Sequence, residues 1–295
     1  MRSQDLLRLY EEGYRDFTGL SLQGLDLGGH ILVDVNFAQS DLTGANFSRA
    51  FLTKANFSEA TLRQANFQFA KVSDACFSAA TLTKANFQGA FAVRTNLSLA
   101  SLSGANMAHI NLRAGQLTQA NFTGTNLTGA NLRNADLRSS RFAWANMAGV
   151  RLIGANISDT DFTNVRLDDA FLNGLKFSDM DLSGVSFHSA RLKGVSFRRV
   201  DLTAANFEHA SLQNSQFTQA RLAGANFESA HVHKAKFFQI DLRRVKAQNI
   251  DWSDAQLTES LLPASLPPAS LSSESLQADL PLPQSPQWVT AWSVS

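Results

Sequence analysis

Apolar side chains recur at every fifth position of this 295-residue chain, from Phe17 to Leu257. All 49 positions of that series are apolar, most are Leu or Phe, and the series never slips by a residue. The residue two places earlier is Ala in 26 of the 49 cases, whereas the other three positions are mostly polar or Gly. A period of five matches neither the 3.6-residue period of a helix nor the two-residue period of a strand.

A short extended step followed by a turn accounts for this period. In an extended step, the apolar centre and the residue two places before it point to the same side, so both enter the interior. The next two residues form a turn, and 14 of the 17 glycines occupy the second of these positions, where Gly adopts a positive φ cheaply. The sequence predicts short sides joined by corners around an apolar axis. Among the expected core centres are Phe47, Leu52, Phe57, Phe67, Phe87, Leu132, Phe187, Phe207 and Phe227.

Several of the five-residue units share one motif, as in Ala45-Asn46-Phe47-Ser48-Arg49 and Ala130-Asn131-Leu132-Arg133-Asn134. These units resemble the pentapeptide-repeat family, whose motif is Ala, then Asp or Asn, then Leu or Phe, then two variable residues. The resemblance covers residues 16–260. It implies an all-β fold, a right-handed quadrilateral β-helix with four units per coil, and a family that is abundant in bacteria. Forty-nine units at four per coil give about 12 coils.

The two ends of the chain depart from the repeat. Residues 1–15 are expected to form a helical cap, with Ser3 as its N-cap and Gly13 ending it. All six prolines lie in the last 33 residues, so 261–295 is expected to be a Pro- and Ser-rich tail. The tail is either mobile or partly docked as a peptide or C-terminal cap. The residues expected to cover the first coil are Leu6, Leu7, Leu9 and Tyr10.

With twenty residues per coil, residues twenty apart stack on one outward face, about 4.8 Å apart. One such column contains Asn46, Asn66 and Asn86, which predicts a ladder of side-chain hydrogen bonds. A second column carries apolar side chains where solvent is expected, and contiguous exposed apolar residues mark interaction sites. Its partner-binding candidates, with the neighbouring Phe69, are Ile31, Phe51, Phe69, Phe91 and Phe171. The small centres Ala92 and Ala247 are the expected places for irregular coils, because they underfill the axis.

Two clusters of polar side chains are weak candidates for cation binding. Oxygen ligands suit Ca²⁺ or Mg²⁺, and imidazoles suit transition metals. Asp is also common at this position of the repeat, and nothing in the sequence positions a second ligand shell, so no metal or cofactor is predicted. The residues are Asp159, Asp161, Asp179, Asp181, His209, His231 and His233.

Charge and composition exclude several function classes. The formal net charge is +1, which provides no general attraction to nucleic acid or to an anionic membrane. The single cysteine, Cys76, excludes an intrachain disulfide. There is no apolar run of about 18 residues and no secretory signal, so a cytoplasmic protein is expected.

Three functions remain open. A solenoid whose axis is filled by apolar side chains has no room for a catalytic cavity. It favours a non-enzymatic scaffold that binds a protein partner through its outward faces. An end-to-end homodimer is a further expectation. The family resemblance implies an alternative, a DNA mimic that modulates a type II topoisomerase such as gyrase. Such a mimic needs a strongly negative surface, and Cys76–Ala135 contains no acidic residue. A metal-binding protein or enzyme is the third and least favoured hypothesis.

Overall fold

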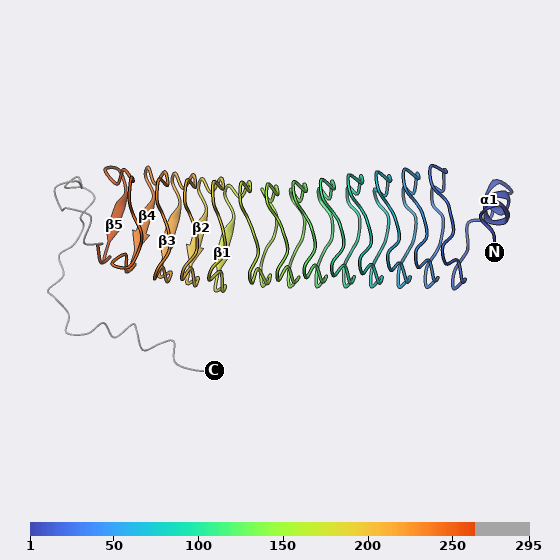
Figure 1. The fold of residues 1–295 in the computed structure, drawn as a ribbon, viewed down its shortest axis with the longest axis horizontal. Helices are drawn as coiled ribbons and strands as arrows, with labels where there is room; N and C mark the ends of the chain where they lie inside the picture. The colour runs from blue at the N-terminus through green and yellow to red at the C-terminus, as the bar shows by residue number, and fades with distance from the viewer. Residues whose placement is uncertain (263–295) are drawn as a thin grey trace, which may run out of the picture.

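The chain winds into a rod of stacked coils (Figure 1), in a computed structural model that describes residues 1–262. Parallel β-bridges join residues twenty apart, beginning with Asp16 to Asn36 and ending with Asp241 to Leu261. Each coil therefore takes twenty residues, or four five-residue units. The predicted all-β fold is confirmed as a parallel β-solenoid with one short N-terminal helix. The number of coils and their handedness stay predictions.

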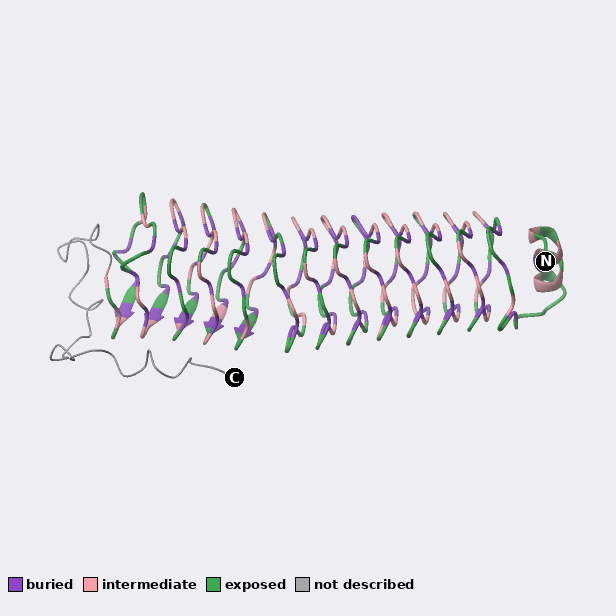
Figure 2. Ribbon diagram, turned by 60° about the horizontal axis from the view of Figure 1, so that its bottom comes forward, coloured by how far each residue is buried: buried purple, intermediate pink, exposed green. Residues whose placement is uncertain are grey.

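Each coil has four sides, which we name by their first outward residue. Side A begins at Asp16, side B at Ser21, side C at Asp26 and side D at Ile31, and each continues every twenty residues. Sides B and D lie on opposite faces of the rod because they are two units apart in a four-unit coil. Buried and exposed stretches alternate along every coil (Figure 2), as the five-residue pattern requires.

Most sides are single bridges, but side A becomes regular sheet in the last coils. Its five three-residue strands pair in parallel in chain order, with Phe177 opposite Phe197 and Phe217 opposite Phe237. The strands stack toward the C-terminal end of the rod (Figure 1). They are β1 (Lys176–Ser178), β2 (Ser196–Arg198), β3 (Gln216–Thr218), β4 (Lys236–Phe238) and β5 (Gln256–Thr258).

The apolar centres fill the axis as one continuous core. Phe67 is fully buried, stacks on Phe47 and Phe87 with ring centroids 4.9 and 4.6 Å away, and meets Phe57 and Phe77 edge-on at 5.6 and 5.5 Å. Offset stacked and edge-to-face rings are the favoured aromatic geometries. The expected centres Phe47, Leu52, Phe57, Phe67, Phe87, Leu132, Phe187, Phe207 and Phe227 are all at most 2% exposed.

The corners need a positive φ whatever residue occupies them. Gly44 has φ of 68°, and the corner residues Phe69 and Trp144 have φ of 57° and 62°. A non-Gly residue in this region is strained by roughly 1 kcal/mol or more. The bond from the following residue's N–H to the preceding centre, as from Ala70 to Phe67 at 3.0 Å, closes each corner. The fold therefore places ordinary side chains, including aromatic ones, at exposed corners.

Helix α1 (Ser3–Glu11) covers the first coil. Leu6 is fully buried, and the Tyr10 hydroxyl donates a hydrogen bond to the Val33 carbonyl at 2.9 Å. The prediction of Ser3 as N-cap is wrong, because Arg2 occupies that place. Instead, the Ser3 hydroxyl accepts a hydrogen bond from the Asp26 N–H at 3.1 Å and so ties the helix to the β-helix. The expected covering residues Leu7, Leu9 and Tyr10 also pack on the core.

The ladder opens between two coils near the middle of the rod. No bridge or backbone hydrogen bond joins Asn156 to Lys176 on side A, or Asp161 to Asp181 on side B, although both pairs belong to the described residues. On sides C and D the ladder continues, for example from Arg166 to Ser186. We call residues 156–185 the junction. The sequence did not predict this opening.

Of the two small centres expected to disturb the coils, only one lies near a disturbance. The coil at Ala92 is regular, with its N–H bonded to the Asn111 carbonyl at 2.8 Å, so that prediction is wrong. Near Ala247, bridges are missing between Arg221 and Asp241 and between His231 and Asp251 among the described residues. The axis there is finished by the indole of Trp252, which is 3% exposed.

The predicted tail, 261–295, falls almost entirely outside the described residues, and the prediction that it is either mobile or partly docked falls there with it. Within residues 1–262, no helix has the length and apolar character needed to cross a membrane.

Candidate protein-interaction surface

Side D exposes a column of apolar side chains near the N-terminal end of the rod. Successive bridges join Ile31 to Phe51, Phe51 to Lys71 and Lys71 to Phe91, so the four residues stack in consecutive coils. Ile31 is 64% exposed, Phe51 38% and Phe91 56%. Together with Phe69, which is 49% exposed at the corner leading into side D, they form what we call the apolar patch. The patch groups four of the five residues predicted for partner binding.

The rings of the patch are held by their neighbours. The Lys71 ammonium lies 4.3 Å from the centroid of the Phe51 ring, within the range of a cation–π contact. The ring of Phe69 lies over Gly89, where an added Cβ would come within 2.5 Å of it. Because Gly89 has no side chain, the Phe69 ring can pack directly on its backbone, which brings the ring toward the coil of Phe91. Lys71 does not break the column, because it packs on it.

The fifth predicted residue, Phe171, lies on the same side but in a different setting. It is half-buried, with the guanidinium carbons of Arg151 and Arg191 at 5.4 and 4.5 Å from its ring centroid. Bridges connect Arg151 to Phe171 and Phe171 to Arg191. Phe171 is therefore covered by long neighbours, as an isolated outward ring is expected to be.

The structure also exposes large apolar residues that sequence reasoning did not single out, among them one at a corner after side A and one at a corner after side B. Leu99 is 57% exposed and Trp144 is 68% exposed. Leu99 follows side A and Trp144 follows side B, so each stands alone at its corner. The sequence contained a signal for this exposure, because both residues occupy a corner position of the five-residue repeat. Single exposed apolar residues are common on protein surfaces, whereas contiguous ones mark binding sites.

The Asn column on side C forms the predicted ladder. The Nδ2 of Asn66 donates to Oδ1 of Asn46 at 3.2 Å, and that of Asn86 donates to Asn66 at 3.2 Å. Each Oδ1 also accepts from a backbone N–H two residues on, as from Ser48 to Asn46 at 3.1 Å. These amides are used within the fold.

The acidic candidates bind partners within the chain. Asp179 accepts hydrogen bonds from Nε and Nη2 of Arg199 at 2.6 and 2.7 Å, which lowers the pKa of its carboxyl group. Asp161 and Asp181 each accept from a backbone N–H two residues on at 2.9 Å. Asp159 lies at a corner with φ of 55°. Within residues 1–262, no three Asp, Glu, His or Cys residues are grouped to hold a metal ion.

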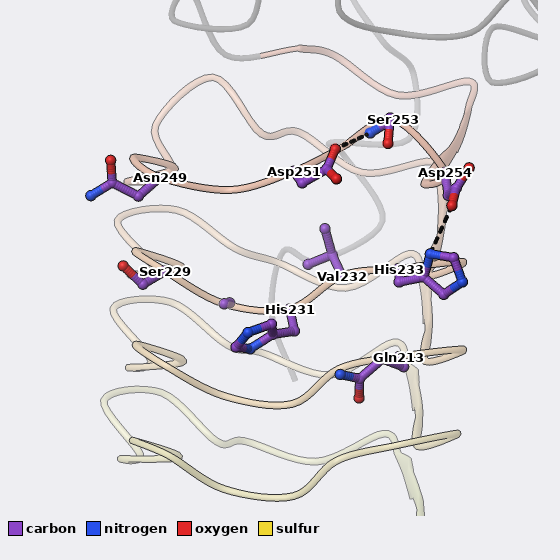
Figure 3. Close-up of a pocket in the computed structure, with 10 residues that line it drawn as sticks. Gln213, Ser229, His231, Val232, His233, Asn249, Asp251, Ser253 and Asp254 are labelled. Carbon is purple, nitrogen blue, oxygen red and sulfur yellow. Dashed lines mark hydrogen bonds and ion pairs between the residues drawn. The ribbon is translucent and has the colours of Figure 1, made fainter.

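The histidine candidates separate in the structure. His209 lies 3.7 Å from Glu208 and edge-on to His188, at a corner between sides C and D. His231 and His233 line a cavity of about 240 Å³ on side D (Figure 3). It lies where the bridge between His231 and Asp251 is missing. His233 Nδ1 approaches Asp254 Oδ2 at 2.7 Å across it.

A parallel solenoid with five-residue sides and an apolar plug defines a class of repeat protein. The chain belongs to the pentapeptide repeat family. The family profile described as pentapeptide repeats (8 copies) matches residues 31–68, 40–78, 80–114, 116–154, 145–184 and 160–199, and the profile described as a pentapeptide repeat region matches residues 190–265.

Solved structures similar to this chain are also pentapeptide repeat proteins. HetL, involved in heterocyst differentiation regulation in the cyanobacterium Nostoc sp. strain PCC 7120, is 19% identical, with a TM-score of 0.49 over 90% of this chain and 99% of that one. Rfr23 from the cyanobacterium Cyanothece 51142 is 25% identical, with a TM-score of 0.21 over 55% and 92%. The plasmid-mediated fluoroquinolone resistance protein QnrB1 is 19% identical, with a TM-score of 0.34 over 82% and 91%. A comparison with curated protein sequences found no match.

Proposed function

We propose that the protein is a non-enzymatic scaffold that binds a protein partner through side D, with the apolar patch as its anchor. The observation that carries this proposal is the contiguity of Ile31, Phe51, Phe69 and Phe91, each at least 38% exposed, on one side of the rod. Burying an aromatic side chain in an interface contributes about 1.5–3 kcal/mol, and a few such anchors dominate binding.

The rigidity of the rod supports this role. Each ring of the patch is attached to a coil whose backbone is bonded to the coils on both sides. The Phe51 N–H donates to the His30 carbonyl at 2.9 Å, and the Leu52 N–H donates to the Lys71 carbonyl at 2.8 Å. A preformed surface loses little conformational entropy on binding. The patch therefore meets its partner in a single arrangement.

The test is a double substitution, Phe51→Ser with Phe91→Ser, followed by affinity capture from the native host and by sedimentation. We expect the specific partner to be lost while the circular dichroism spectrum stays unchanged. The matched control is Leu99→Ser with Trp144→Ser, which removes two apolar side chains that are at least as exposed from corners after sides A and B. Unchanged capture by the patch variant, or equal loss in the control, contradicts the proposal.

The alternative function, DNA mimicry toward a type II topoisomerase, has less support from surface charge. Of the Asp column on side B, Asp201 is paired with Arg221 at 3.2 Å, and neighbouring Asp179 is paired with Arg199. Mimicry depends on a continuous negative surface, because the target binds phosphates. Inhibition of supercoiling by the purified protein is the outcome that would favour this alternative. The same sedimentation run tests the end-to-end homodimer, which stays a prediction.

A further inference from the structure

Beyond the apolar patch, side D continues as a row of exposed cations. Bridges carry the side from Phe91 through Asn111 and Asn131 to Arg151 and then onward past Phe171. The cations lie on the outward positions of side D and on the corner that follows it. We call them the cationic strip, and they are Arg113, Arg133, Arg151, Arg191 and Lys193.

No ion pair within residues 1–262 neutralises any member of the cationic strip. Where an Asp lies twenty residues before an Arg, the two pair, as Asp74 with Arg94 at 2.7 Å near the start of side D and Asp179 with Arg199 at 2.6 Å after side A. The difference lies in the sequence of side D. Its outward positions and following corner carry no Asp or Glu between Asp74 and Asp251.

The corner that precedes side D does not compensate this charge. Its Asp168 is paired with Arg166 at 2.9 Å, and its Glu208 lies 3.7 Å from both His188 and His209. Among residues 1–262, no ion pair joins Asp169 or Glu208 to the strip. Uncompensated cations in a row produce a local positive potential although the whole chain has a net charge of only +1. The strip therefore attracts an anionic partner at a defined place on the rod.

We propose that the cationic strip binds an acidic segment of the protein partner whose hydrophobic residues occupy the apolar patch. This inference rests on the proposed function and adds the chemistry of the partner, namely a polypeptide with apolar residues followed by Asp and Glu. From Phe51 to Lys193 the surface spans seven coils, about 34 Å at 4.8 Å per coil. About ten extended residues cover that length. Arginine guanidinium groups match carboxylates in geometry and charge.

Two other occupants fit the surface less well. Single-stranded nucleic acid binds where positive charge alternates with open aromatic faces for base stacking. Here the Phe171 ring has a guanidinium group on it from both Arg151 and Arg191, and nucleic acid leaves the aliphatic Ile31 unmatched. A second copy would have to offer the Asp column of side B, and that column is interrupted by Arg141 and Arg221.

The test uses the full chain and a fluorescein-labelled 20-residue peptide with Leu and Phe in one half and Glu in the other. We expect fluorescence anisotropy to report binding that weakens at least tenfold in the triple variant Arg151→Gln, Arg191→Gln, Lys193→Gln. Higher salt should weaken it in the same direction. The matched control removes the same charge from side B and its corner, by Arg63→Gln, Lys84→Gln and Arg141→Gln, and should change binding less than twofold.

The outcomes separate this inference from the proposed function. If the peptide does not bind, if the control triple weakens binding equally, or if a 20-residue oligothymidylate binds more tightly, the inference is wrong. A rise in peptide affinity after Glu274→Gln with Asp279→Gln would make the chain's own tail the occupant and would also overturn it. A native partner that depends on Phe51 and Phe91 but not on the strip leaves the proposed function standing alone. Dependence on the strip without dependence on the patch overturns the patch as the anchor, and with it the inference that the partner's hydrophobic residues occupy the patch.

Discussion

The N-terminal coils and the junction are built from the same repeat, yet only the first have an unbroken ladder. Between Phe37 and Phe87 the rings occupy sides A and C alternately and stack in consecutive coils. At the junction the large ring changes sides, from Phe162 on side B to Phe177 on side A. Those two rings lie 6.3 Å apart edge-on, and sides A and B are the sides where the bridges are missing.

The comparison shows that regular hydrophobicity is not sufficient for regular coils. Two rings on adjacent sides of successive coils need more room along the axis than one coil spacing of about 4.8 Å provides. The coils separate there, on sides A and B. Side D, opposite to side B, keeps its bridges through Arg151, Phe171 and Arg191. The proposed interaction surface thus crosses the junction without a break.

The largest expected effect on the free energy of unfolding comes from removing one aromatic ring from each of the two regions. Phe67 has four ring neighbours, whereas Phe162 has two, Phe142 at 5.7 Å and Phe177 at 6.3 Å. We expect Phe67→Ala to lower the free energy of unfolding by about 3–5 kcal/mol. We expect Phe162→Ala to cost about 1–3 kcal/mol less, because each ring contact contributes about 0.5–1.5 kcal/mol.

Urea unfolding followed by circular dichroism measures both losses. Leu132→Ala, another fully enclosed centre in a regular coil, serves as the reference for a non-aromatic position. Equal costs at Phe67 and Phe162 would contradict the view that the junction is less well packed.

The same comparison separates what the sequence could predict from what it could not. The period of five predicted the coil, the core centres and the outward column, because each depends only on which residues are apolar and how far apart they are. The junction depends on the three-dimensional fit of Phe162 against Phe177, which the spacing does not contain. Similarly, the apolar patch could be predicted by stacking residues twenty apart, whereas the packing of the Phe69 ring on Gly89 is visible only in the structure. The cationic strip was present in the sequence, but its lack of ion pairs was not.

Amide hydrogen exchange should locate the junction directly. The N–H groups of Ile157, Phe162, Lys176 and Asp181 have no backbone acceptor within residues 1–262. By contrast, the Phe47 N–H donates to the Asn66 carbonyl at 2.7 Å. We expect the four junction amides to exchange at least about tenfold faster than Phe47, since local opening there costs less than opening an intact ladder. Uniform protection along the rod would show that the ladder is closed in solution.

A smaller effect is expected from Gly89→Ala, which acts on the apolar patch. Gly89 has φ of 65°, and its new Cβ would come within 2.5 Å of the Phe69 ring. Gly104→Ala is the matched control, because Gly104 has φ of 66° but its nearest neighbour, Lys84 Cγ, is 3.7 Å away. Both variants should lose about 1 kcal/mol from the strained backbone. Only Gly89→Ala should also weaken partner capture, and equal capture by the two variants would show that the position of Phe69 is unimportant.

The smallest effect concerns the ion pair that ties the junction to the coil that follows it, between Asp179 and Arg199. The Arg199 guanidinium, through its hydrogen bonds, lowers the pKa of Asp179 in the folded protein below its ordinary value near 4. The pair therefore contributes its full stabilisation above about pH 4 and loses it as the pH falls through the lowered pKa. Because both side chains are partly exposed to solvent, which screens the pair, we expect only a small contribution to the free energy of unfolding. Asp179→Asn should make urea stability between pH 6 and 2 less dependent on pH than in the parent protein.

Asp136→Asn is the control, since Asp136 pairs with Arg138 of its own coil and its pKa is lowered in the same way. If the pair matters for holding coils together, only Asp179→Asn should also speed amide exchange in β2. Equal exchange in both variants would confine the role of Arg199 to the surface charge.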